Sequence, residues 1–160
     1  MNAQTIKENQ VDEFTKNKVI RTSWEFISKS KVYAHVRASK INDEQTLDFR
    51  IMLPGGLGSG DHVFAIPQGD AIMIKLENDS IRTLKNTEHK ISCSGCGAVN
   101  IVGSQAEGIE IFSLLNKADF EQLSKYKIKK IRLYTTDGYK ETEIAEKFQD
   151  IVKKELALII

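Results

Sequence analysis

Apolar residues at every second position are the feature that most constrains what this chain can fold into. The clearest case covers residues 47–53, where Leu47, Phe49 and Ile51 alternate with Asp48 and Arg50. Successive side chains of a β-strand point to opposite faces, so this alternation is typical of a strand with one buried face. Much of the chain is therefore predicted to fold into half-buried strands.

Further alternating or apolar runs, bounded by turn-forming residues, predict more strands. They cover residues 20–26, 32–39, 63–66, 72–76, 81–84, 108–115 and 127–135. In the first run, Ile20, Thr22, Trp24 and Phe26 are expected to share one face. Eight or nine strands are too many for one open sheet when each strand has one apolar face and one polar face. Two antiparallel layers are therefore expected.

Two segments have the spacing of a helix instead. Asn116 is placed as an N-cap with Asp119 three residues later, which predicts a short helix to about Lys125. A longer amphipathic helix is predicted after the turn at residues 137–138. Its apolar stripe is formed by Ile144, Phe148, Ile151, Val152, Leu156 and Ile159.

These patterns predict an α+β fold that is mainly β. The core would be a two-layer antiparallel β-sandwich, with one short helix and a C-terminal amphipathic helix packed on it. Residues 1–17 are polar and have no sustained period, which predicts an N-terminal tail. Residues 18–160 would then form a single β-rich domain.

The charge balance limits the classes of partner. The 160 residues hold 23 Lys and Arg against 22 Asp and Glu, a net charge of +1, so no strong field favours nucleic acid. A basic stretch at residues 125–132 is balanced by acids that follow it, and a solvated face is expected there. No apolar run approaches the roughly 18 residues of a membrane span. The classes of partner that remain are a protein and a small-molecule ligand. The protein itself is either a monomer or a homo-oligomer.

Cys93 and Cys96 form the sharpest local motif, and three states are open to them: a local disulfide, free thiols or a metal site with His89. A structural zinc ion needs four ligands, and a second cysteine pair is missing. If residues 89–93 are extended, His89 and Cys93 lie about 13 Å apart at about 3.3 Å per residue, too far to share an ion. No cofactor is expected.

No constellation of reacting groups is evident. The glycine-rich residues 56–60 lack the lysine and hydroxyl of a phosphate-binding loop, and the segment around Ser104 lacks the glycine-x-serine-x-glycine arrangement of a nucleophile elbow. The histidines, at positions 35, 62 and 89, are expected to be solvated. No catalytic or cofactor-binding residue is therefore predicted. The surroundings of Trp24, Tyr33 and Tyr139 are the places where a structure should be inspected for a concave, aromatic-lined pocket.

Four segments of this sequence are similar to segments of a known protein family: residues 22–25, 91–97, 103–108 and 131–139. Over about residues 12–160 the chain resembles a family of small bacterial proteins of unknown function. Members of that family look exported, with a leader ahead of the position of Gln4, so the resemblance implies a periplasmic or exported location. The start at Met1, without a visible leader, favours the cytoplasm instead. The resemblance implies no activity.

Two hypotheses follow from the sequence. The first is a non-catalytic β-rich binding or interaction module, located in the cell envelope. The alternative is a small metal- or thiol-dependent protein built around Cys93 and Cys96.

Overall fold

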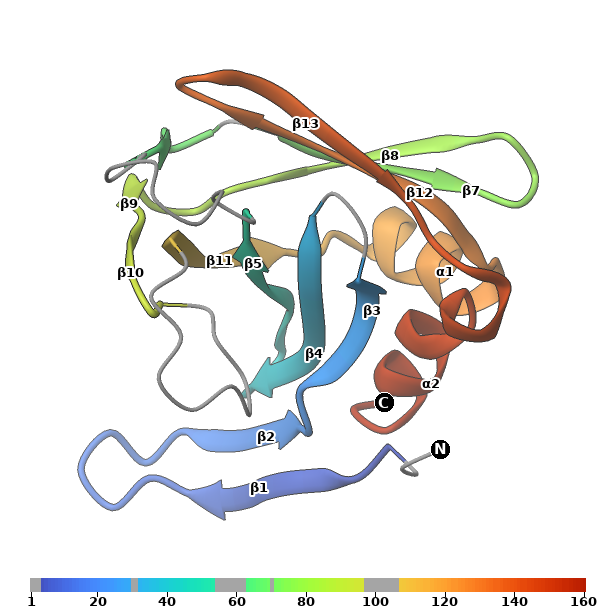
Figure 1. Cartoon of the computed structure of the whole chain (residues 1–160). Helices are drawn as coiled ribbons and strands as arrows, with labels where there is room; N and C mark the ends of the chain where they lie inside the picture. Colours follow the sequence, from blue (N-terminus) through green and yellow to red (C-terminus); the bar gives the residue numbers. More distant parts are fainter. Residues whose placement is uncertain (1–3, 30–31, 54–62, 70, 97–106) are drawn as a thin grey trace.

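The structure, a computed structural model, describes residues 4–29, 32–53, 63–69, 71–96 and 107–160 (Figure 1). Within these ranges the chain forms three antiparallel sheets and two short α-helices. The prediction of an α+β fold that is mainly β is confirmed. None of the helices in the described ranges has the length and apolar character of a membrane span.

The large sheet has seven strands, in the order β1-β2-β4-β5-β11-β10, with β3 also paired to β4. Its strands are β1 (Ile6–Val11), β2 (Lys18–Thr22), β3 (Glu25–Lys29), β4 (Tyr33–Ile41), β5 (Glu44–Met52), β10 (Cys93–Ser94) and β11 (Glu107–Leu114). The small sheet has the order β13-β12-β7-β8. It consists of β7 (Ala71–Leu76), β8 (Ile81–Lys85), β12 (Ile128–Thr135) and β13 (Gly138–Glu143). A ribbon of β6 (Ala65–Ile66) and β9 (Lys90–Ile91) completes the set.

The core lies between the two sheets. The large sheet contributes the alternate residues of its central strands, among them Val36, Phe49 and Ile111, all fully buried. The small sheet faces them with rows such as Ile74 and Leu133. Figure 1 shows the small sheet across the top of the molecule, with the large sheet and the helices all below it. Each sheet therefore has one face in the core and one face pointing away from it.

Helix α1 (Lys117–Lys125) forms as its sequence predicts. The side chain of Asn116 accepts a hydrogen bond from the backbone N–H of Asp119, at 2.8 Å, and so caps the first turn. Helix α1 packs against α2 (Ile151–Ala157), which in turn packs on β4. In Figure 1 the two helices lie along one side of the core.

The long C-terminal helix is a wrong prediction. Residues 138–143 form strand β13, and after the short 3-10 helix η1 (Glu146–Phe148) only residues 151–157 are α-helical. A two-residue turn pairs β13 with β12, so that Glu141 lies opposite Arg132 and Tyr139 opposite Tyr134. Cross-strand pairing thus overrides the helical spacing there. The apolar stripe still packs, because Val152, Leu156 and Ile159 are fully buried.

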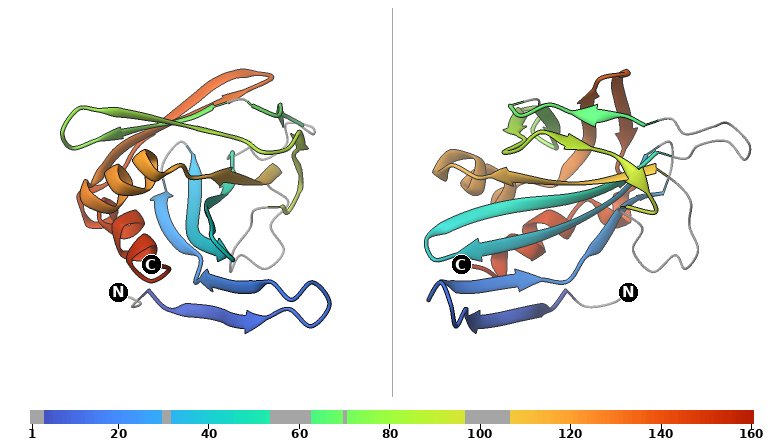
Figure 2. Two further views of the ribbon diagram at one scale, coloured as in Figure 1. Left: turned by 180° about the vertical axis from the view of Figure 1, so that it is seen from behind. Right: turned by 90° about the vertical axis from the view of Figure 1, so that its left-hand side faces the viewer.

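Two N-terminal predictions are also corrected. Residues 1–17 were expected to be a tail, but strand β1 lies within them and pairs with β2. Both views of Figure 2 show this hairpin at the end of the large sheet that is remote from the small sheet. The strand expected over residues 20–26 is broken at Ser23 and Trp24 into β2 and β3, which pair with different halves of β4.

Leu156 offers a test of this packing. Replacing the fully buried Leu156 by alanine should lower the free energy of unfolding by about 2–5 kcal/mol, because the change removes apolar contacts and leaves a cavity. Lys154→Ala, at an exposed position of the same helix, should change it by less than about 0.5 kcal/mol. Urea denaturation of the two variants checks the difference. Equal values would show that α2 does not cover the core.

Candidate functional site

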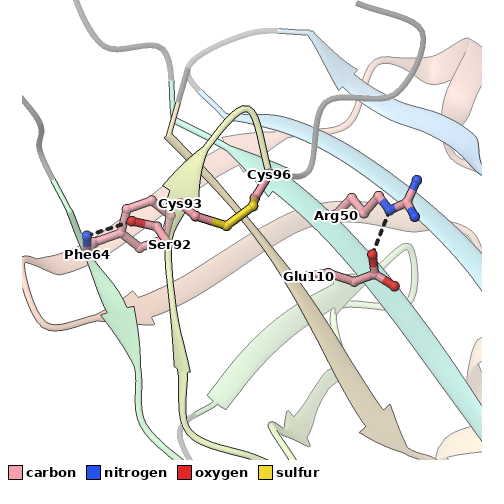
Figure 3. Close-up of a disulfide and its surroundings, with 6 residues drawn as sticks. All are labelled: Arg50, Phe64, Ser92, Cys93, Cys96 and Glu110. Atoms are coloured by element: carbon pink, nitrogen blue, oxygen red, sulfur yellow. Dashed lines mark hydrogen bonds and ion pairs between the residues drawn. A yellow bond between two sulfur atoms is a disulfide. The ribbon is translucent and has the colours of Figure 1, made fainter. Parts of the chain in front are cut away.

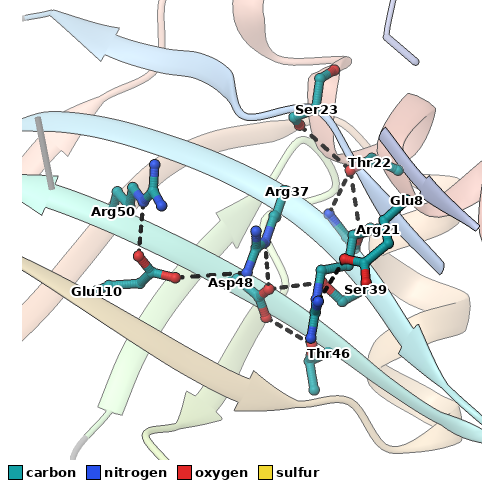
Figure 4. A network of polar contacts seen from close by, with 11 residues as sticks. Glu8, Arg21, Thr22, Ser23, Arg37, Ser39, Thr46, Asp48, Arg50 and Glu110 are labelled. Atoms are coloured by element: carbon teal, nitrogen blue, oxygen red, sulfur yellow. Dashed lines mark hydrogen bonds and ion pairs between the residues drawn. The ribbon is translucent and has the colours of Figure 1, made fainter. Parts of the chain in front are cut away.

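The face of the large sheet that points away from the core carries a network of charged residues. Cross-strand partners point to the same side of a sheet, and here Arg37 lies opposite Asp48, and Arg50 lies opposite Glu110. Arg21 and Glu8 extend the row across β2 and β1. We call this surface, shown in Figure 4, the charged face.

Asp48 is the centre of the charged face. Its carboxylate, with a side chain only 2% exposed, accepts hydrogen bonds from Arg37 Nε at 2.8 Å, Ser39 Oγ at 2.7 Å and Thr46 Oγ1 at 2.7 Å. These three donors come from β4 and β5 and replace the water that a buried carboxylate loses. Both oxygens of Asp48 are therefore already occupied by the protein's own groups.

The other ion pairs of the charged face are more open to solvent. Glu110 accepts from Arg50 Nε at 2.8 Å and lies 3.6 Å from Arg37, so it links the two arginines. Arg21 and Glu8 pair at 2.6 Å. Their side chains are about 30% exposed, so these pairs are more strongly screened than that of Asp48.

Trp24 lies over this network. The guanidinium carbons of Arg37 and Arg50 are 4.4 and 4.2 Å from the centre of its ring, within the range of cation–π attraction. The sequence predicted Trp24 on the buried face with Ile20 and Thr22, and that prediction is wrong. The break between β2 and β3 places Trp24 outside regular strand geometry and turns its side chain to the charged face.

His35 is another correction, because it was expected to be solvated. It is on the charged face opposite Arg50 but is only 4% exposed. The ring of Phe26, its cross-strand neighbour on β3, lies 4.5 Å away in an edge-on arrangement. Tyr33, 6.4 Å from the same phenylalanine, completes a row of rings along this edge of the sheet.

A disulfide joins Cys93 and Cys96 at the far edge of the large sheet, with 5.2 Å between the Cα atoms (Figure 3). Gly95, with φ of 74°, provides the left-handed residue that the tight turn between them requires. The turn is attached to the body through Ser92, whose hydroxyl accepts a hydrogen bond from the backbone N–H of Phe64 at 3.0 Å. Of the three states considered for these cysteines, the structure contains the disulfide.

The remaining sequence candidates contribute no site in the part of the chain that the structure describes. His89 is exposed, and no three metal-ligating side chains gather among the described residues, so His89, Cys93 and Cys96 do not form such a group. Residues 56–60, His62 and Ser104 lie outside the described residues. No observation tests the alternative of a metal- or thiol-dependent protein, which stays a prediction.

The small sheet also turns one face away from the core. We call it the outer face; its members are Met73, Lys75, Ile81, Thr83, Lys130, Arg132, Tyr134, Tyr139, Glu141 and Glu143. Arg132 lies 4.6 Å from the ring centre of Tyr139, and Tyr139 is 6.2 Å from Tyr134. Glu141 accepts hydrogen bonds from both Arg132 and Lys130, which lowers the pKa of this carboxyl group.

The outer face contains a shallow hollow of about 210 Å³. It is lined by Met73, Lys75, Ile81, Lys130, Arg132 and Glu141. Among the aromatic residues Trp24, Tyr33 and Tyr139, the last lies beside this hollow through its contact with Arg132. Trp24 and Tyr33 belong to the charged face instead.

A buried carboxyl group, Glu155 on α2, is a feature that the sequence reasoning missed. Its side chain is completely buried, and neither oxygen has a hydrogen bond of good geometry. Burial raises its pKa to about 7, and the negative charge of Glu25 adds to the rise, while Thr22 and the backbone of Ala38 favour the charged form. Glu155 falls beside Leu156 in the helix, and no sequence pattern distinguishes it from a solvated glutamate.

Comparisons with known proteins identify no relative: no family model, no curated protein and no solved structure matches this chain. The resemblance to a bacterial family stays a prediction.

The buried ion pair gives the second prediction. Asp48→Asn should lower the free energy of unfolding by about 1.5–3 kcal/mol, because Arg37 loses the carboxylate at 2.8 Å and keeps only Glu110 at 3.6 Å. Glu8→Gln, in the more exposed pair with Arg21, should cost at most about 1 kcal/mol. Chemical denaturation at pH 7 measures both. A cost for Asp48→Asn as small as that of the control would contradict the assigned role.

Glu155 gives a prediction about pH. The folded-state pKa of about 7 lies above the ordinary value of 4.5, so the unfolded chain releases this proton first, and stability falls as the pH rises from 4.5 through 7. Glu155→Gln should remove this pH-dependent loss. The free energy of unfolding of the variant, relative to that of the natural protein, should therefore rise by about 1–3 kcal/mol between pH 4.5 and 7 and then level off.

The control for this measurement is Glu146→Gln, at an exposed position of η1. Denaturation curves at pH 4, 6 and 8 should show no pH-dependent difference for that variant. A difference between Glu155→Gln and the natural protein that stays constant from pH 4 to 8 would contradict the raised pKa.

Proposed function

We propose that this protein is a non-catalytic binding module and that it binds through the outer face of the small sheet. The observation that carries this proposal is the hollow of about 210 Å³, whose lining combines apolar side chains with charged groups. With Met73 and Ile81 beside four charged side chains, this lining is more polar than that of a typical small-molecule pocket and resembles the mixed polar and apolar surface of a protein interface. In Figure 1 the described helices and the large sheet all lie on the other side of the small sheet.

Exposure of apolar side chains supports this choice of surface. Ile81 is 50% exposed and Tyr139 is 58% exposed, and both belong to the outer face, Ile81 on the edge strand β8 and Tyr139 on the opposite edge strand β13. Exposing such side chains to water is unfavourable, and a partner that covers them removes this cost. The rigid sheet beneath holds them in fixed positions, which lowers the entropy cost of binding.

The charged face is less suited to binding or to catalysis. Its acidic and basic groups satisfy one another, and the Asp48 oxygens are occupied by Arg37, Ser39 and Thr46. A general base needs a lone pair that can reach a substrate. We therefore interpret the charged face as a structural network that stabilises the large sheet.

The disulfide supports the envelope location that belongs to this proposal. Disulfides persist in oxidising compartments and are rare where thiols are kept reduced. Cys93 is exposed at the edge of the sheet, so a reducing compartment would have access to the bond between Cys93 and Cys96.

Binding of small probes tests the function. Isopropanol and phenol, titrated separately into ¹⁵N-labelled protein, should shift the backbone amide signals of the outer face, near Met73, Ile81 and Arg132. Ile81→Ser should weaken these effects at least threefold, because it removes apolar surface from the hollow.

The matched control is Ile91→Ser. Ile91 is 59% exposed, comparable to Ile81, but it lies on β9 outside the outer face. This variant should leave the amide shifts of the outer face unchanged. Shifts scattered over the whole surface, or concentrated on the charged face, would contradict the proposal.

A further inference from the structure

We propose that the ligand of the outer face is a segment of another protein in which a carboxylate side chain adjoins an apolar one. This inference rests on the proposed function and adds the chemical class of the ligand. It starts from an unfavourable contact: Lys75 on β7 and Lys130 on β12 are direct cross-strand neighbours. Like charges in this arrangement repel each other, which destabilises the pairing of the two strands.

The protein's own acids compensate this pair only in part. Lys75 pairs with Asp79 at 3.0 Å, and Lys130 has Glu143 at 3.5 Å, but the two carboxylates are 77% and 83% exposed. Ion pairs with side chains as exposed as these contribute little to the stability of the fold. Glu141 is the one carboxylate in the lining, and it is shared between Lys130 and Arg132.

The lining of the hollow is itself positive, because it holds the cationic side chains of Lys75, Lys130 and Arg132 against the single carboxylate of Glu141. The carboxylates of Asp79 and Glu143 balance the two lysines from the exposed rim, where a carboxylate of a ligand can replace them. A carboxylate of a ligand placed between Lys75 and Lys130 would relieve their repulsion and gain two charge-assisted hydrogen bonds. The electrostatics of the site thus favour an anion.

Apolar side chains lie directly beside these cations. Ile81 is the cross-strand neighbour of Lys75, and Met73 is the neighbour of Arg132. An anion without an apolar part would leave this surface in water, whereas a ligand with both features would cover it. The flexible side chain of Met73 can adapt to apolar groups of different shapes.

The size of the hollow distinguishes a protein segment from a small molecule. Sites that enclose a small molecule have volumes of about 300–1,000 Å³. At about 210 Å³ the hollow is smaller than that and open on a sheet face. Its volume suits one or two side chains, as in the central pocket of a protein interface.

Three synthetic peptides with blocked ends test the inference: Gly-Leu-Glu-Leu-Gly, Gly-Leu-Lys-Leu-Gly and Gly-Gly-Glu-Gly-Gly. Each is titrated into ¹⁵N-labelled protein at low salt, and the amide shifts of the outer face are followed. The first peptide should bind at least fivefold more tightly than either of the others, because it alone carries both the carboxylate and the apolar groups.

Charge-reversal variants identify the residues responsible. Lys75→Glu should weaken binding of the Leu-Glu-Leu peptide at least fivefold and should strengthen binding of the Leu-Lys-Leu peptide. Lys154→Glu, an equal change of charge at an exposed position of α2, should affect neither. Thermal denaturation with far-UV circular dichroism of each variant, recorded first, verifies that it is folded.

The possible failures are distinguishable. If isopropanol and phenol bind the outer face but the three peptides bind equally, the inferred ligand class is wrong while the proposed function stands. If hexanoate alone binds as tightly as the Leu-Glu-Leu peptide, the ligand is a small amphipathic acid, and the inference is overturned. If no probe shifts the outer face, the proposed function fails as well.

Discussion

Burial of the inner rows of the two sheets against each other is the constraint on which the rest of the structure depends. Val36, Phe49 and Ile111 of the large sheet share one core with Ile74 and Leu133 of the small sheet. Because side chains alternate along a strand, fixing these rows in the core also fixes which residues point away from it. Both the charged face and the outer face are consequences of this packing.

The charged side chains of the two exposed sheet faces are balanced in different ways. On the charged face, acids and bases alternate across strands, and the most buried acid, Asp48, has three donors. On the outer face, Lys75 and Lys130 lie side by side, and their acidic partners extend into solvent. The first arrangement is complete within the protein, whereas the exposed ion pairs of the second can be replaced by those of a ligand that also covers the apolar surface.

The broken strand between β2 and β3 shows how one local irregularity shapes a surface. At the break the Thr22 hydroxyl accepts from the backbone N–H of Ala38 at 2.9 Å, so a side chain satisfies a donor that continuous pairing would have served. The same break turns Trp24 towards Arg37 and Arg50. It also adjoins Glu155, whose raised pKa reflects its burial behind this part of the sheet.

The sequence by itself determined most of the strands with strict alternation, though not the break within residues 20–26, and it determined the capped helix at Asn116 and the mainly β class. These features depend on local periodicity and on hydrogen bonds between near neighbours. It could not predict β13, which is held in a hairpin by partners on β12, or the strand within residues 1–17, which exists through pairing with β2. Alternation assigns faces but not neighbours. Only the tertiary structure therefore decided that Lys75 meets Lys130, that Trp24 lies over two arginines and that Glu155 is buried, since these contacts join residues distant in the chain.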